Sequence, residues 1–146
     1  MLRYAALLGL LAATVAPAAA QLAAPVAPVA PNEPLRGIER GIEQANSSAQ
    51  VGSMLITPGN GNNPTIVIDV KGAAGKPEIV TINRGFGCAD DVGQQVAVLG
   101  TLSPGGRLHA TSPLPFDHLM SGNYNIIVHN SHAMSQSNAC GHLYLH

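Results

Sequence analysis

From Val51 onward, the chain alternates between short runs rich in β-branched residues and stretches of Gly, Pro and Asn. The runs cover residues 52–57, 65–70, 78–83, 94–99, 107–111, 124–129 and 142–146. Runs of this length, separated by turn-forming residues and with no helical pattern among them, are typical of strands. The pattern therefore predicts one all-β domain over residues 51–146, an antiparallel sandwich or flattened barrel.

The composition indicates what fills this domain. Aromatic residues make up 3% of the chain and Trp is absent, so the core must consist of Val, Ile and Leu. Residues 114–119, between two of the strand runs, are expected to form a turn that closes one end of the sandwich.

The N-terminal segment has the pattern of a secretory signal peptide over residues 1–20. Arg3 supplies a positive charge, an apolar run covers residues 5–15, and small residues at 18–20 resemble a cleavage site. This run is shorter than the roughly 20 residues that a membrane-spanning helix needs. We therefore expect export to the periplasm or secretion, and no membrane span.

Residues 21–50 have a different composition again. Residues 21–34 repeat Ala, Pro and Val, which favours an extended polyproline II linker. In residues 35–45, apolar side chains recur at helical spacing, weakened by two glycines. We expect a marginal helix or a disordered arm there. The residues that carry this spacing are Leu35, Ile38, Ile42 and Ala45, and the glycines are Gly37 and Gly41.

Charge and cysteine content narrow the classes of protein further. Without the signal peptide the chain keeps six of its seven basic residues and all eight acidic ones, so its formal charge is 6 − 8 = −2. A weakly acidic surface does not indicate nucleic-acid binding. Cys88 and Cys140 are the only cysteines, and an even number in an exported domain predicts one structural disulfide. Two free buried thiols are the alternative.

The late part of the sequence is similar to that of a known family. Tyr124 and His129 have Tyr-x-x-x-x-His spacing in a strand-like run, and Asn138-Ala139-Cys140-Gly141 follows. Copper/zinc superoxide dismutases, and short secreted bacterial proteins of the same fold, have a late strand ending in a copper-ligand histidine. Their Ala-Cys-Gly segment bonds back to a cysteine placed after the first metal-binding strand. The chain resembles this pattern over residues 51–145.

The resemblance implies a Greek-key sandwich, a Cys88–Cys140 bond and the place of the third copper ligand for His129. Chordin-repeat domains, another secreted sandwich family with Tyr-x-x-x-x-His strands, are the alternative family. The Ala-Cys-Gly segment favours the dismutase family.

The chain departs from the dismutase pattern where the chemistry is expected. The family's His-x-His copper ligands correspond to Thr81 and Asn83. The positive residue that guides superoxide, three positions before the second cysteine, corresponds to Ser137. Between Cys88 and residue 99, the only candidate zinc ligands are Asp90 and Asp91. The resemblance therefore implies a member of the fold group without dismutase activity.

The histidines are the remaining candidates for chemistry. All six lie between His109 and His146, and His129, His132 and His142 are the candidate metal ligands. Copper and zinc bind imidazole nitrogen readily. Alternatively, His129 is hydrogen-bonded to a carbonyl at a strand end and the others are solvated.

Three hypotheses follow for the function. The first is an exported sandwich protein with a binding or structural role in the periplasm and no resident cofactor. The second is a copper- or zinc-binding periplasmic protein. The third is a divergent dismutase with a copper site rebuilt from C-terminal histidines.

Overall fold

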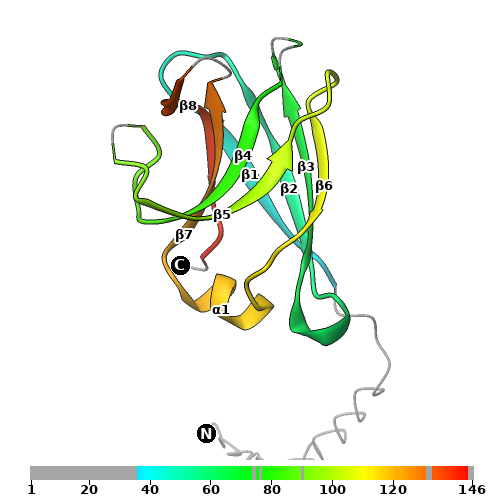
Figure 1. Cartoon of the computed structure of the whole chain (residues 1–146). Helices are drawn as coiled ribbons and strands as arrows, with labels where there is room; N and C mark the ends of the chain where they lie inside the picture. Colours follow the sequence, from blue (N-terminus) through cyan, green and yellow to red (C-terminus); the bar gives the residue numbers. More distant parts are fainter. Residues whose placement is uncertain (1–35, 74, 76, 90, 131–132, 145–146) are drawn as a thin grey trace, which may run out of the picture. The chain divides into compact units, whose positions relative to one another are not determined.

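The computed structural model describes residues 36–144 apart from 74, 76, 90 and 131–132 (Figure 1). The expected signal peptide, the Pro/Ala linker and His132 therefore lie outside the described residues. The strands are β1 (Ile38–Gln44), β2 (Val51–Thr57), β3 (Thr65–Lys71), β4 (Ile79–Arg84), β5 (Gln94–Thr101), β6 (Arg107–Thr111), β7 (Tyr124–Asn130) and β8 (Ala133–His142). A 3-10 turn, η1 (Asn60–Asn62), and one short helix, α1 (Phe116–Ser121), complete the described elements.

Alternation between buried and exposed positions explains most of these strands. In β3, Ile66, Ile68 and Val70 are fully buried and their neighbours face outward. β-branched residues suit such a pleated, half-buried surface. Equivalent apolar positions on the other strands, together with Leu143 just after β8, complete one core, which contains Met54, Ile56, Val80, Ile82, Ile126 and Val128. The prediction of an aliphatic core is confirmed.

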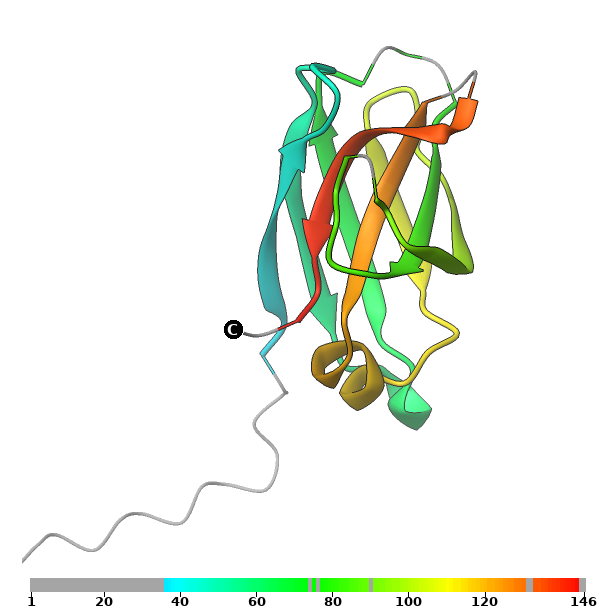
Figure 2. The ribbon, with the colours of Figure 1, turned by 90° about the vertical axis from the view of Figure 1, so that its left-hand side faces the viewer.

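The strands form one nearly closed antiparallel sheet in the order β5-β4-β7-β8-β1-β2-β3-β6. Strand β4 pairs with β5, the sheet nearly closes where β5 contacts β6, and β7 returns to pair with β4, which is the Greek-key arrangement. Strand β1 joins the two halves of the sheet: residues 38–42 pair with β2, and Glu43 and Gln44 pair with β8 (Figure 2). The predicted all-β Greek-key sandwich or flattened barrel is confirmed.

The prediction of a marginal helix or disordered arm at residues 35–45 is wrong, because Ile38–Gln44 form β1. Ile38 and Ile42 fit a strand as well as a helix, but Arg40 between them hides the alternation. Pairing with β2 and β8 satisfies the backbone of this segment. The β-domain therefore begins before residue 51, where we expected its boundary.

The strand expected at residues 142–146 is also wrong for the residues described there, because β8 runs from Ala133 to His142 and residues 143–144 are not in a strand. Its first residues are mostly small and polar, so hydrophobic alternation does not reveal them. The expected closing turn at residues 114–119 becomes α1, whose Leu119 is fully buried. The other strand predictions are confirmed, with boundaries that differ by at most two residues.

Candidate functional site

A polar face lies on the side of β4, β7 and β8 that points away from the core. Cross-strand pairing aligns Thr81 with Ile127 and Asn83 with Asn125, and on the other side of β7 it aligns Asn125 with His142. Paired residues in an antiparallel sheet project to the same side. Thr81, Asn83 and Asn125 are nevertheless buried, as is His129 at the end of β7.

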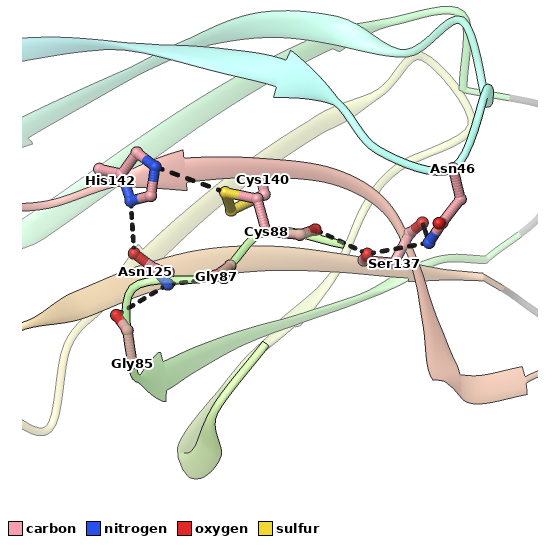
Figure 3. The surroundings of a disulfide bond; sticks show 8 residues. All are labelled: Asn46, Gly85, Gly87, Cys88, Asn125, Ser137, Cys140 and His142. Atoms are coloured by element: carbon pink, nitrogen blue, oxygen red, sulfur yellow. Dashed lines mark hydrogen bonds between the residues drawn. A yellow bond between two sulfur atoms is a disulfide. The ribbon is translucent and has the colours of Figure 1, made fainter. Parts of the chain in front are cut away.

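The described residues of the segment between β4 and β5, 85–89 and 91–93, cover this face, and the segment is fastened to it at three points (Figure 3). Cys88 is bonded to Cys140 on β8, with their Cα atoms 5.4 Å apart. Asn125 Nδ2 donates to the carbonyl oxygens of Gly85 and Gly87, each at 2.9 Å. Ser137 Oγ donates to the carbonyl oxygen of Cys88 at 2.9 Å. The predicted disulfide is present, and it holds the covering segment in place.

A hydrogen-bonded chain of three side chains occupies one end of the face. Thr81 Oγ1 donates to Asn83 Oδ1 at 2.6 Å and lies 2.7 Å from His129 Nε2. Asn83 Nδ2 points to the carbonyl of Gly93, so its oxygen is the atom directed at Thr81. Since a hydroxyl has a single proton and Thr81 gives it to Asn83, the imidazole must donate from Nε2–H. The network therefore assigns the proton of His129 to Nε2.

His142 is held at the other end of the face by a different set of contacts. Its Nδ1 lies 2.7 Å from Asn125 Oδ1, and its Nε2 lies 3.7 Å from Cys88 Sγ. The Asn125 amide nitrogen is already directed at two carbonyls, so its oxygen must accept from Nδ1–H. In neutral His142 the lone pair of Nε2 therefore faces the sulfur.

The structure does not bring the imidazoles of His129 and His142 together. His142 pairs with Asn125, which lies four residues before His129 on β7. The backbone positions of His129 and His142 are therefore about 13 Å apart along the strand direction. The Cys88–Cys140 bond lies between these positions, opposite Ile127. Among the described residues, no three His, Cys, Asp or Glu side chains are grouped to hold a metal ion. Metal binding by the three predicted histidines stays a prediction.

Asn125 is a residue that the sequence patterns did not single out. It is polar and fully buried in an otherwise apolar stretch of β7, and it orients both His142 and the covering segment. A polar residue within a strongly hydrophobic strand is the sequence signal that could have identified it.

A second buried polar group lies outside this face. Glu78 Oε1 accepts from Gln50 Nε2 at 2.7 Å and also from Asn138 Nδ2. Glu78 and Gln50 are both almost completely buried, and within the described part of the chain Glu78 Oε2 and Gln50 Oε1 have no hydrogen-bond partner. The group connects the segment before β2, the start of β4 and the middle of β8.

Comparisons of the chain with protein-family models, with curated proteins and with solved structures find no match. Among the described residues, no helix has the length and apolar character needed to cross a membrane. The function is therefore inferred from the residues of the polar face.

Proposed function

We propose that this protein is an exported superoxide dismutase-like sandwich in which a neutral hydrogen-bond network has replaced the copper site. Its role is then non-catalytic, either structural or in binding a partner in the periplasm. The observation that carries this proposal is the 2.7 Å contact between Thr81 Oγ1 and His129 Nε2.

The resemblance gives the first two copper ligands the positions of Thr81 and Asn83, and the third that of His129. Thr81 contacts both Asn83 and His129. However, a hydroxyl and an amide are poor copper ligands compared with imidazole. His129 Nε2 also carries a proton that it donates to Thr81, so this nitrogen has no lone pair to offer.

Ser137 supports the same proposal. It stands where the resemblance places the positive residue that guides superoxide, but it is buried and donates to the Cys88 carbonyl. Asn46 Nδ2 also donates to the backbone carbonyl oxygen of Ser137 at 3.0 Å. These contacts give Ser137 a structural task in fastening the covering segment.

An assay of superoxide removal tests the proposal. With excess copper, the wild-type protein should remove superoxide no faster than the same copper bound to an unrelated protein. A rate near the diffusional limit of about 10⁹ M⁻¹s⁻¹ that disappears in His129→Ala would contradict the proposal.

A gain-of-ligand variant supplies the positive control. Thr81→His combined with Asn83→His should restore three adjacent imidazoles, with nitrogen ligation visible in the copper(II) electron paramagnetic resonance spectrum. Adding His129→Ala to this variant should weaken that signal. Stoichiometric copper or zinc in wild-type protein purified from its native compartment would instead favour the metal-binding hypothesis.

A further inference from the structure

We propose that Cys88, Cys140 and His142 form a binding site for a thiophilic metal ion, Zn(II) or Cu(I), when their disulfide is reduced. The site uses none of Thr81, Asn83 and His129, so it is independent of the function proposed above. Its ligands come from the covering segment and from β8.

The orientation of His142 is the first argument. Asn125 Oδ1 accepts the Nδ1 proton at 2.7 Å, and the Asn125 amide is fixed in turn by the Gly85 and Gly87 carbonyls. Metal-binding histidines commonly donate their second ring nitrogen to an oxygen acceptor in this way, which sets the tautomer. The remaining nitrogen, Nε2, is directed at the sulfur of Cys88 (Figure 3).

The distance between the ligand atoms is the second argument. Zinc binds thiolate sulfur at about 2.3 Å and imidazole nitrogen at about 2.0–2.1 Å in tetrahedral sites. Those bond lengths place a sulfur and a nitrogen of one site about 3.6 Å apart. Cys88 Sγ and His142 Nε2 are 3.7 Å apart in the folded protein. A metal ion could therefore bridge these two atoms without moving them appreciably.

The second sulfur requires only a small displacement. In a tetrahedral site the two sulfurs would stand about 3.8 Å apart, compared with about 2.05 Å in a disulfide. Rotation of the Cys140 side chain about its Cα–Cβ bond can supply this separation of under about 2 Å, so that Cys88 Sγ keeps its distance to His142 Nε2. The backbone of Cys140 stays in β8, where Ile127 and Glu43 are its cross-strand partners.

A pocket of about 180 Å³ gives access to this place. Arg40, Glu43, Cys140 and His142 are among its lining residues. Two thiolates outweigh the single positive charge of Arg40, and a water molecule or the Glu43 carboxylate can complete a four-coordinate zinc site. Three-coordinate Cu(I) needs no further ligand.

The disulfide controls whether this site exists. A dithiol reductant transfers two electrons and two protons, giving two cysteine thiols and the disulfide of the reductant. Metal binding then releases the two thiol protons, because thiolate is the ligand form. In the oxidised protein the sulfurs are bonded to each other, which agrees with the absence of a three-ligand cluster among the described residues.

Metal titration of the oxidised and reduced full-length protein tests the proposal. Reduced wild-type protein should bind one Co(II), as a spectroscopic substitute for Zn(II), with a sulfur-to-metal charge-transfer band. It should also take up one Cu(I) from a chromophoric chelator. Oxidised protein should show no such band. His142→Ala should weaken binding of either ion at least tenfold, the smaller end of what site-orienting partners contribute.

His109→Ala is the matched control, because His109 is an exposed histidine on β6. It should leave both titrations unchanged. Circular dichroism of the reduced protein shows whether the fold persists. Equal affinities for wild type and His142→Ala would overturn the proposal, as would loss of the fold on reduction, since an unfolded chain binds through its cysteines alone. If Zn(II) and Co(II) fail but Cu(I) binding depends on His142, the ion is Cu(I).

Discussion

At the scale of single residues, one hydroxyl determines the state of the polar face. Thr81 is completely buried, and it both donates to Asn83 and accepts from His129. Few other side chains of this size could satisfy both neighbours, because valine has no hydroxyl and alanine leaves a void. The tautomer of His129 is thus set by a residue 48 positions away in the sequence.

Replacing Thr81 tests this dependence. Thr81→Val keeps the shape but removes the hydroxyl that Asn83 Oδ1 and His129 Nε2 contact, and loss of a buried hydrogen-bond partner costs about 1–3 kcal/mol. The free energy of unfolding, measured by urea denaturation, should fall by about that amount or more. Thr81→Ser keeps the hydroxyl and should lose less. If the two variants were equally stable, the hydroxyl would not be important.

At the scale of elements, β1 and β8 show where sequence patterns fail. Strands with clear alternation, such as β3, were predicted correctly because their burial depends on local spacing alone. In β1, apolar residues at 38 and 42 satisfy helical and strand periodicities together, and only the long-range pairing with β2 and β8 decides between them. In β8, a mostly polar start is held by pairing with β7.

The candidate site likewise contains features that sequence patterns could predict and features that depend on long-range contacts. The resemblance pointed to Cys88, Cys140 and His129 as candidates, and of these the structure shows the Cys88–Cys140 bond. Asn125 and Ser137, by contrast, acquire their roles from contacts with distant backbone carbonyls. No spacing rule could have given those contacts. The separation of His129 from His142 likewise depends on the strand register, which the sequence did not define.

Glu78 provides a prediction at this scale, because it connects three segments through Gln50 and Asn138. Glu78→Ala removes the acceptor of two amide donors and should lower the free energy of unfolding by about 2–4 kcal/mol. Glu78→Gln keeps an acceptor oxygen and should be clearly more stable than Glu78→Ala in thermal denaturation. Equal losses for both variants would mean that the carboxylate contributes something other than an acceptor.

At the scale of the whole molecule, the disulfide joins positions 52 residues apart in the sequence. Closing a loop of this length stabilises a domain by roughly 4 kcal/mol in the chain-entropy model. Reduction of the wild-type protein should therefore lower Tm by more than about 10 °C in scanning calorimetry. Mass spectrometry under non-reducing conditions should show the Cys88–Cys140 cross-link. An unchanged Tm after complete reduction would show that the sheet alone determines stability.

The pairing of β1 with β8 also constrains how the protein folds. These are the first and last strands of the β-domain, and Glu43 pairs with Cys140 almost a hundred residues later. Contacts between such distant positions slow folding, because the intervening chain must be ordered before they form. A growing polypeptide cannot form this pairing until β8 has been synthesised. Strand β1 should consequently be more accessible to proteases before β8 is available than in the folded protein.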